Sequence, residues 1–333
     1  MATTVEILLA ATPLLVAGLL LVGLLWPATR AMPIAWVTAL VIGYFIWEMP
    51  PDWLAAASIN GVITALAILW IVFGALLLLY MLQEAGAFDR INRGFATVSD
   101  DRRVQIVLVG FFLATFIEGA AGFGTPAAVV APLMLGLGFP ALAAVIAGII
   151  GHIIAVTYGA VGTPIIIGIQ SPMQVFEGEI VEGGFTVIEF SNQVAAWAAT
   201  YHALVGFVMP FIAVLMVVHF FGDDEDGSWG PALEVAPLCL FAGISFAIPY
   251  WASAWFLTAE FPALIGSMVG GAITISVLRA GYLLPDSHWE FPPREEWPDH
   301  WVGTIEPGSS GTVEEGLEDI SLARAWAPYA LLV

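Results

Sequence analysis

Long apolar stretches alternate with short polar ones along most of the chain. A helix needs about 20 mostly apolar residues to cross the roughly 30 Å of hydrocarbon in a bilayer, and this pattern supplies that length repeatedly. We therefore predict an all-α polytopic membrane protein. The simplest spanning helices are expected near residues 6–26, 33–47, 61–82, 194–221, 232–251 and 261–278.

Two further apolar segments do not fit a single straight span. Segment 104–139 is too long for one crossing and slightly short for two, while segment 141–170 is interrupted by small residues. The stretch 83–103 is rich in Arg, so the positive-inside rule makes it cytoplasmic and puts the N-terminus outside. The acidic stretch 171–193 should lie outside. A re-entrant hairpin over 104–139 followed by a broken helix over 141–170 gives the required odd number of crossings, and the reverse order is less economical.

The hairpin and the broken helix share a tripeptide, Gly124-Thr-Pro126 in one and Gly162-Thr-Pro164 in the other. Gly lets the chain unwind, Thr is a favoured N-cap and Pro suits the first helical position. Each tripeptide predicts a half-helix N-terminus whose free N–H groups and partial positive charge attract an anion. Paired discontinuous helices mark substrate sites in secondary transporters. The alternative is that these glycines only let helices pack closely.

Glu118 precedes the first tripeptide in an otherwise apolar region. An ionisable group inside a membrane marks a candidate functional site. Glu118 is either a structural acid bonded to the glycine-rich backbone or the carrier of a coupled proton. A protonatable Glu fits symport, because a fixed negative charge would repel an anionic substrate. His152 is either a packing partner or a second proton-coupling group.

Other polar residues in these segments carry weaker predictions. Each of them either forms a hydrogen bond between helices or lines the substrate path, and the sequence leaves both alternatives open. These residues are Thr115, Thr157, Tyr158, Gln170 and Ser171. His202 and His219 receive no role. The sequence contains no metal-ligand spacing, no phosphate-binding glycine loop and no nucleophile motif. We therefore expect no enzyme activity, no metal and no cofactor.

Composition narrows the class and the partners. The chain is 60% hydrophobic with 28 acids against 8 bases, all of them Arg, and its net charge is -20. Acidic loops without Lys indicate a halophilic, high-salt setting, where excess surface charge keeps protein soluble. Nucleic acid is disfavoured as a partner, because no basic cluster exists to neutralise phosphate. The single Cys239 excludes an intrachain disulfide.

Phe116-Ile-Glu-Gly-Ala-Ala-Gly-Phe-Gly-Thr-Pro126 and Tyr158-Gly-Ala-Val-Gly-Thr-Pro164 closely resemble the signature segments of the lactate permease family. This family comprises proton-coupled importers of L-lactate, D-lactate and glycolate. The resemblance implies a fold of two inverted repeats, each with a re-entrant hairpin and a broken helix. By this resemblance, Glu118 is the expected proton-coupling group. The residues that match the family's motif as substrate-site candidates are Gly119, Gly122, Gly124, Thr125, Gly159, Gly162 and Thr163.

The chain departs from the family in two ways. Members of the family carry an Asn where His152 stands, and they continue into a second half that this chain only begins. We expect a transmembrane transporter domain over 1–279, an acidic cytoplasmic loop over 280–323, and the truncated start of a further span over 324–333. A gene fragment, half of a split permease and a shortened product all fit this pattern.

These observations predict a multi-pass cell-membrane protein, one half of a transporter, that imports lactate or a related 2-hydroxy monocarboxylate by proton symport. The expected partners are the small carboxylate, the proton and the lipid bilayer, with a second-half chain or a homo-oligomer left open. Two alternatives remain. The chain is an incomplete half with no transport activity alone, or it transports another small anion such as a dicarboxylate or sulfate.

Overall fold

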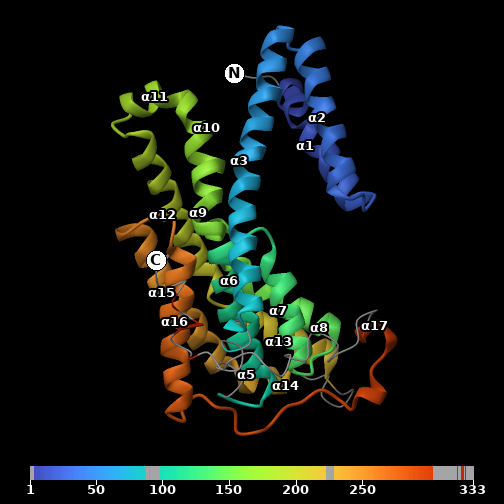
Figure 1. Ribbon diagram of the computed structural model, residues 1–333, viewed down its shortest axis with the longest axis vertical. Coiled ribbons are helices and arrows are strands. Elements are labelled where there is room, and N and C mark those ends of the chain that lie inside the picture. Colours follow the sequence, from blue (N-terminus) through green and yellow to red (C-terminus); the bar gives the residue numbers. More distant parts are fainter. Residues whose placement is uncertain are drawn as a thin grey trace. The chain divides into compact units, whose positions relative to one another are not determined.

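The computed structural model describes residues 4–87, 90, 98–222, 229–302, 321, 324–325 and 327. The described residues form helices and no strands (Figure 1). They divide into two units, residues 1–71 and residues 72–333. Within the described residues, seven helices are long and apolar enough to cross a membrane, which confirms the predicted all-α polytopic class.

The first unit is built from apolar helices. α1 (Thr4–Gly18) continues into the π-helical η1 (Leu19–Gly23), α2 (Ala28–Phe45) packs against them, and α3 (Pro51–Glu84) begins in this unit. Small residues such as Ala31 and Ala35 fill the contact, and most large apolar side chains point outward. Such a surface suits lipid rather than water. α2 and α3 each begin earlier than the apolar runs predicted.

The predicted re-entrant hairpin opens the second unit. One arm consists of α5 (Arg102–Gln105), η2 (Ile106–Leu113) and α6 (Ala114–Ala121), and the other is α7 (Thr125–Gly136). The Arg102 guanidinium bonds the Leu137 carbonyl at 2.5 Å, so the second arm returns to the level where the first begins. The second arm is a 12-residue helix that rises only about 18 Å, less than the roughly 30 Å of a bilayer core.

The predicted broken helix follows directly. It consists of α8 (Ala141–His152), the 3-10 segment η3 (Ile153–Tyr158), α9 (Gly159–Ile165) and the π-helical η4 (Ile166–Gln170). Helical structure then continues beyond the predicted end at residue 170, through α10 (Ser171–Met173), the 3-10 segment η5 (Gln174–Phe176) and α11 (Glu177–Glu182). In Figure 1 this path runs from the end of the unit near α5 to the end that carries α11.

Four long helices and three short helical segments complete the described part of the second unit. α12 (Val187–Gly206) starts earlier than the predicted residue 194, because Thr186 and Glu189 form a capping box. It meets α13 (Met209–Phe221) at a bend of 40°. After α14 (Gly230–Glu234), α15 (Ala236–Phe256) and α16 (Pro262–Arg279) pack closely as an antiparallel pair. The 3-10 turn η6 (Arg294–Glu296) and α17 (Asp299–Val302) follow.

A buried ionic cluster ties the hairpin mouth to the segment after α16. The Arg103 side chain is fully buried and bonds Asp101 at 2.7 Å, Glu234 at 2.8 Å and the Ser287 carbonyl at 2.6 Å. Burial opposes ionisation of Glu234, but hydrogen bonds from Ser287 and Arg103 outweigh it and lower the pKa of this carboxyl to about 2. Arg103, at the end of the Arg-rich stretch, and Ser287, in the predicted loop 280–323, therefore lie at the same end of this unit.

Some predictions fall largely outside the described residues. The acidic run 223–226 is not described, the predicted loop 280–323 is described only to Val302 and at Ser321, and the predicted span start 324–333 only at three positions. The division into domains therefore stays a prediction.

Candidate functional site

The hairpin turns through three consecutive residues in the left-handed region. Gly122, Phe123 and Gly124 have φ of 60°, 52° and 77°. The Thr125 hydroxyl donates to the Gly122 carbonyl at 2.5 Å, and Gly124 occupies the N-cap position with no side-chain cap bond. The prediction that Thr125 caps the half-helix is therefore wrong. Its hydroxyl closes the turn instead of accepting from an amide.

The start of α7 offers an anion fewer free N–H donors than the sequence predicted. The Thr125 amide donates to the Gly122 carbonyl at 2.9 Å, the Ala127 amide donates to the Gly124 carbonyl at 3.2 Å, and Pro126 has no N–H. What remains is the positive end of the helix dipole, next to the exposed tip residues Phe123 and Gly124.

The broken helix repeats this local structure. Ala160, Val161 and Gly162 have φ of 45°, 54° and 74°, and the Thr163 hydroxyl donates to the Ala160 carbonyl at 2.6 Å. Gly124 and Gly162 have nearly the same backbone angles, with ψ of 9° and 12°. Thr163 is again a turn-closing residue and not the predicted cap. The shared tripeptide thus encodes one geometry twice, although no local pattern predicts the positive φ of Ala160 and Val161.

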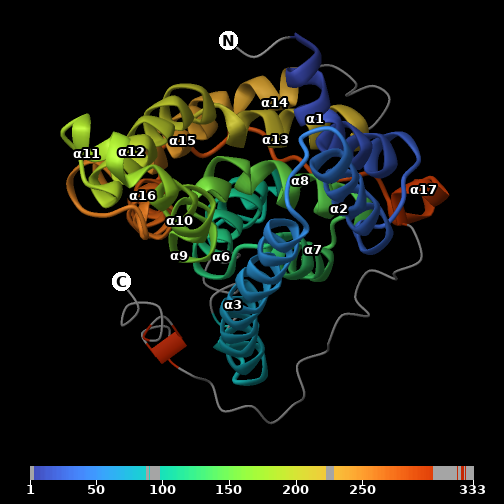
Figure 2. The same ribbon diagram turned by 90° about the horizontal axis from the view of Figure 1, so that it is seen from above.

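The two breaks meet at one crossing. A Cβ added to Gly122 would lie 2.7 Å from the Ala160 nitrogen, and one added to Gly159 would lie 2.5 Å from Glu118 Oε1. Only glycine permits these approaches, because no real Cβ packs so closely. Figure 2 looks along the helices and shows α6 beside α9. The predicted site residues of the hairpin and the broken helix are therefore brought together.

Glu118 lies inside this crossing, 3% exposed. Its Oε2 atom is buried and has no hydrogen-bond partner among the residues that the structure describes. The nearest titratable partner is His152 at the end of α8, whose Nε2 lies 3.9 Å from that oxygen. His152 Nδ1 is 2.6 Å from the Gly148 carbonyl, and because a carbonyl only accepts, Nδ1 carries a proton. His152 Nε2, the ring nitrogen that does not bond the Gly148 carbonyl, therefore faces Glu118 Oε2.

The turn between α15 and α16 covers one side of the crossing. A Cβ on Gly162 would lie 2.6 Å from the Ala259 carbonyl oxygen and 2.8 Å from Glu260 Cα. Gly119 approaches the start of α16, with the Leu264 nitrogen 3.0 Å from its added Cβ. Ala259 and Glu260 were not among the residues predicted for the site. Their only sign in the sequence was an acidic residue between two predicted spans, and this does not indicate what that residue packs against.

The secondary polar candidates separate into different roles. Thr115 is fully buried and donates to carbonyls of its own helix, at 2.9 Å to Phe111. Tyr158 is also buried, and its hydroxyl donates to the Ala195 carbonyl of α12. Ser171 is exposed, beyond the crossing in the chain. Tyr158 thus bonds between helices, as the helix-packing interpretation predicted, whereas the Thr115 bonds stay within its own helical segment.

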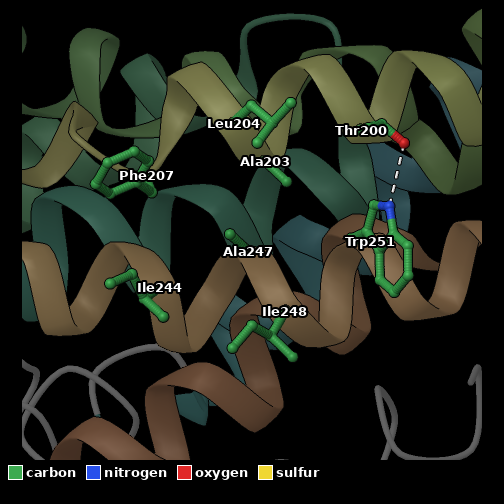
Figure 3. Close-up of a pocket in the computed structure, with 8 residues that line it drawn as sticks. All are labelled: Thr200, Ala203, Leu204, Phe207, Ile244, Ala247, Ile248 and Trp251. Atoms are coloured by element: carbon green, nitrogen blue, oxygen red, sulfur yellow. Dashed lines mark hydrogen bonds between the residues drawn. The ribbon is translucent and has the colours of Figure 1, made fainter.

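An apolar groove with a volume of about 400 Å³ lies between α12 and α15 (Figure 3). Its polar groups are already satisfied. The Thr200 hydroxyl accepts from the indoles of Trp251 at 3.1 Å and Trp255 at 2.9 Å, and donates to the Ala196 carbonyl at 2.9 Å. The lining offers a carboxylate no donor and no positive charge, so this groove does not compete with the crossing as an anion site.

The fold and the crossing define a class. A polytopic helical protein whose re-entrant hairpin and broken helix cross at a buried carboxylate is a membrane transporter and not an enzyme. Within that class, the chain belongs to the L-lactate permease family, whose family model matches residues 6–333.

Individual relatives agree with the family. The chain is 29% identical over 295 residues to the L-lactate permease of Bacillus subtilis. This alignment covers 88% of the present chain and 47% of the relative. It is 28% identical over 299 residues to the glycolate permease GlcA of Escherichia coli, covering 89% of this chain and 48% of the relative. The chain spans about half the length of these relatives. No solved structure matches it.

Proposed function

We propose that this chain takes part in the secondary active import of L-lactate, or of the related 2-hydroxy monocarboxylates D-lactate and glycolate, across the cell membrane by proton symport. The carrying observation is the crossing of the two breaks around Glu118, whose Oε2 has no bonded partner among the described residues and faces His152. The names of the relatives support the substrate class, since they include L-lactate and glycolate permeases.

The substrate carboxylate binds at the positive ends of the two half-helices. Two dipole ends add their fields at the crossing, where the low-polarity surroundings strengthen them. The residues that the motif match supplies surround this site: Gly119, Gly122, Gly124, Thr125, Gly159, Gly162 and Thr163. The Thr125 and Thr163 hydroxyls already donate to backbone carbonyls, so the attraction for the anion comes mainly from the two helix ends. A small 2-hydroxy acid suits such a site, because its single carboxylate needs no second cation and its hydroxyl can bond a peptide group.

The coupled proton is carried by either the Glu118 carboxyl or the His152 imidazole. An ionised Glu118 repels the substrate anion, so a proton arrives before the anion binds, and the pair crosses together with little net charge. Release of the proton on the far side restores the repulsion and expels the anion. In this arrangement the N-terminus lies outside, and the stretch 83–103 and the loop 280–323 face the cytoplasm.

The test is uptake of labelled lactate into proteoliposomes that contain the purified chain, with and without an inward proton gradient. Gradient-driven accumulation that lactate and glycolate compete away, and that succinate and sulfate do not, supports the proposal. Equal uptake without the gradient contradicts proton coupling. Competition by succinate or sulfate indicates another anion, and absence of uptake until a second-half chain is added supports the incomplete-half alternative.

A further inference from the structure

The second break is held in a conformation that its own residues disfavour. Val161 is β-branched and adopts φ of 54°, and Ala160 before it adopts φ of 45°. Left-handed backbone at such residues is rare, and it persists only where the surroundings impose it. Contacts with the Ala259–Glu260 turn and the Thr163 bond hold the downstream side. The upstream side needs its own support.

Tyr158 supplies that support directly before Gly159. Its side chain is 0% exposed, and its hydroxyl donates to the Ala195 carbonyl of α12. Its ring meets the Tyr250 ring of α15 edge-on, with centroids 5.2 Å apart. The residue that leads into the left-handed turn is therefore fixed both by a directional bond and by an aromatic contact.

Tyr250 extends the support back to α12. It is also 0% exposed, its ring stacks on Phe246 at 5.2 Å, and its hydroxyl lies 3.0 Å from His202 Nδ1. His202 and Ala195 are seven residues apart on α12, which places them two turns apart on one face. The contacts thus form a closed path from α12 through both tyrosines and back to α12.

We propose that Tyr158, Tyr250 and His202 form a hydrogen-bonded brace that positions the second half-helix for the substrate and sets the place of Gly159 behind Glu118. Packing alone would be met by Phe at both tyrosine positions, whereas the hydroxyls fix direction and would be costly to bury unpaired. The three are positioning residues, since none lies at the crossing itself. The role in transport rests on the proposed function; the role in holding the backbone does not.

Hydrogen exchange by mass spectrometry tests the backbone role on the full chain in nanodiscs. Tyr158→Phe and Tyr250→Phe should each speed exchange in peptides covering 159–166 by about fivefold, the ratio expected for one lost hydrogen bond. His202→Ala should act like Tyr250→Phe, and His202→Asn, which can replace Nδ1, should restore slow exchange. Tyr201→Phe, the same change at an exposed tyrosine of α12, should have no effect.

Lactate uptake by the same variants tests the transport role. The brace variants should raise KM by about fivefold with kcat changed less, because they misplace a binding element. Exchange that stays slow in both Phe variants overturns the brace. Faster exchange with unchanged KM overturns its transport role. Faster exchange in a protein whose unmodified form moves no lactate, even after a second-half chain is added, keeps the brace and rejects the proposed function.

Discussion

His152 Nε2 lies 3.9 Å from Glu118 Oε2, and the two residues come from different interrupted segments. The Gly148 carbonyl occupies the other imidazole nitrogen, so the nitrogen that can gain or lose a proton faces the carboxyl. A single added proton can sit on either group without a change in the charge of the pair. This relationship places one titratable group of the hairpin next to one of the broken helix, at a separation slightly beyond a direct hydrogen bond.

Replacing Glu118 with Gln should uncouple uptake from the proton gradient. A gradient of about one pH unit supplies a driving force of about 1.4 kcal/mol per proton, which corresponds to about tenfold accumulation at one proton per substrate. Glu118→Gln mimics the protonated carboxyl permanently, so lactate exchange should persist while accumulation falls to none. Labelled counterflow and gradient-driven uptake measure the two. Glu182→Gln, at an exposed position, should accumulate normally, and full accumulation by Glu118→Gln would rule out its coupling role.

His152 should act only through Glu118. His152→Asn keeps a side-chain amide that can donate to the Gly148 carbonyl but removes the titratable nitrogen near Oε2. We expect this variant to change the pH dependence of uptake in the wild-type background and to have no added effect in Glu118→Gln. A double-mutant cycle of uptake across pH measures this coupling. Additive effects would show that the two groups work separately.

Gly159→Ala should damage the site more than the fold. Its Cβ would lie 2.5 Å from Glu118 Oε1, so the carboxyl must move. Overpacking of this kind costs about 1–3 kcal/mol of stability. Uptake should fall severely, with a lower but cooperative thermal transition. Gly168→Ala is the matched control, because its added Cβ meets no described atom within 4 Å. Normal uptake by Gly159→Ala would show that the contact is not functionally important.

Val161→Gly should leave thermal stability unchanged or raise it by up to about 1 kcal/mol, since glycine removes the left-handed penalty while adding unfolded-state freedom. The same substitution at Val145, an ordinary position in α8, should lower stability by roughly 0.5–1 kcal/mol through its helix propensity. Thermal unfolding of the purified chain in detergent compares the two. Equal losses in both variants would mean that Val161 is not strained.

Acid should weaken the Arg103 cluster in a defined window. The pKa of Glu234 is lowered from 4.5 to about 2, so its ionisation stabilises the fold fully above pH 4.5. That stability is lost as the pH falls from about 4.5 towards 2. The melting temperature should therefore drop across this window more in the wild type than in Glu234→Gln, which starts lower and stays flatter. Glu177→Gln, at an exposed position, should follow the wild-type curve.

Much of the fold could be predicted because membrane spans depend on length and hydropathy alone. The parity of the Arg-rich and acidic stretches was enough to predict a hairpin over 104–139, and the Arg102 bond to Leu137 shows how its arms close. Helix ends were less accurate. α12 begins at Val187, before the apolar run, because the Thr186–Glu189 capping box stabilises a polar first turn that hydropathy does not register.

The site was only partly predictable for a related reason. Repetition of Gly-Thr-Pro identified both breaks, yet it did not reveal that Thr125 and Thr163 donate backward and close turns. Propensity favours Thr as a cap, and the left-handed residues before it override that preference. The brace partner Tyr250 lies 92 residues after Tyr158, and no local pattern connects them. Such contacts depend on how helices cross, which a single sequence does not specify.

The Arg103 cluster also constrains the order in which the chain can be assembled. Asp101 is available as soon as the hairpin is made, but Ser287 is synthesised 184 residues after Arg103. Until the segment after α16 has been synthesised, the Arg103 guanidinium has only part of its set of acceptors. The hairpin mouth can therefore complete its hydrogen bonds only after that segment has been made.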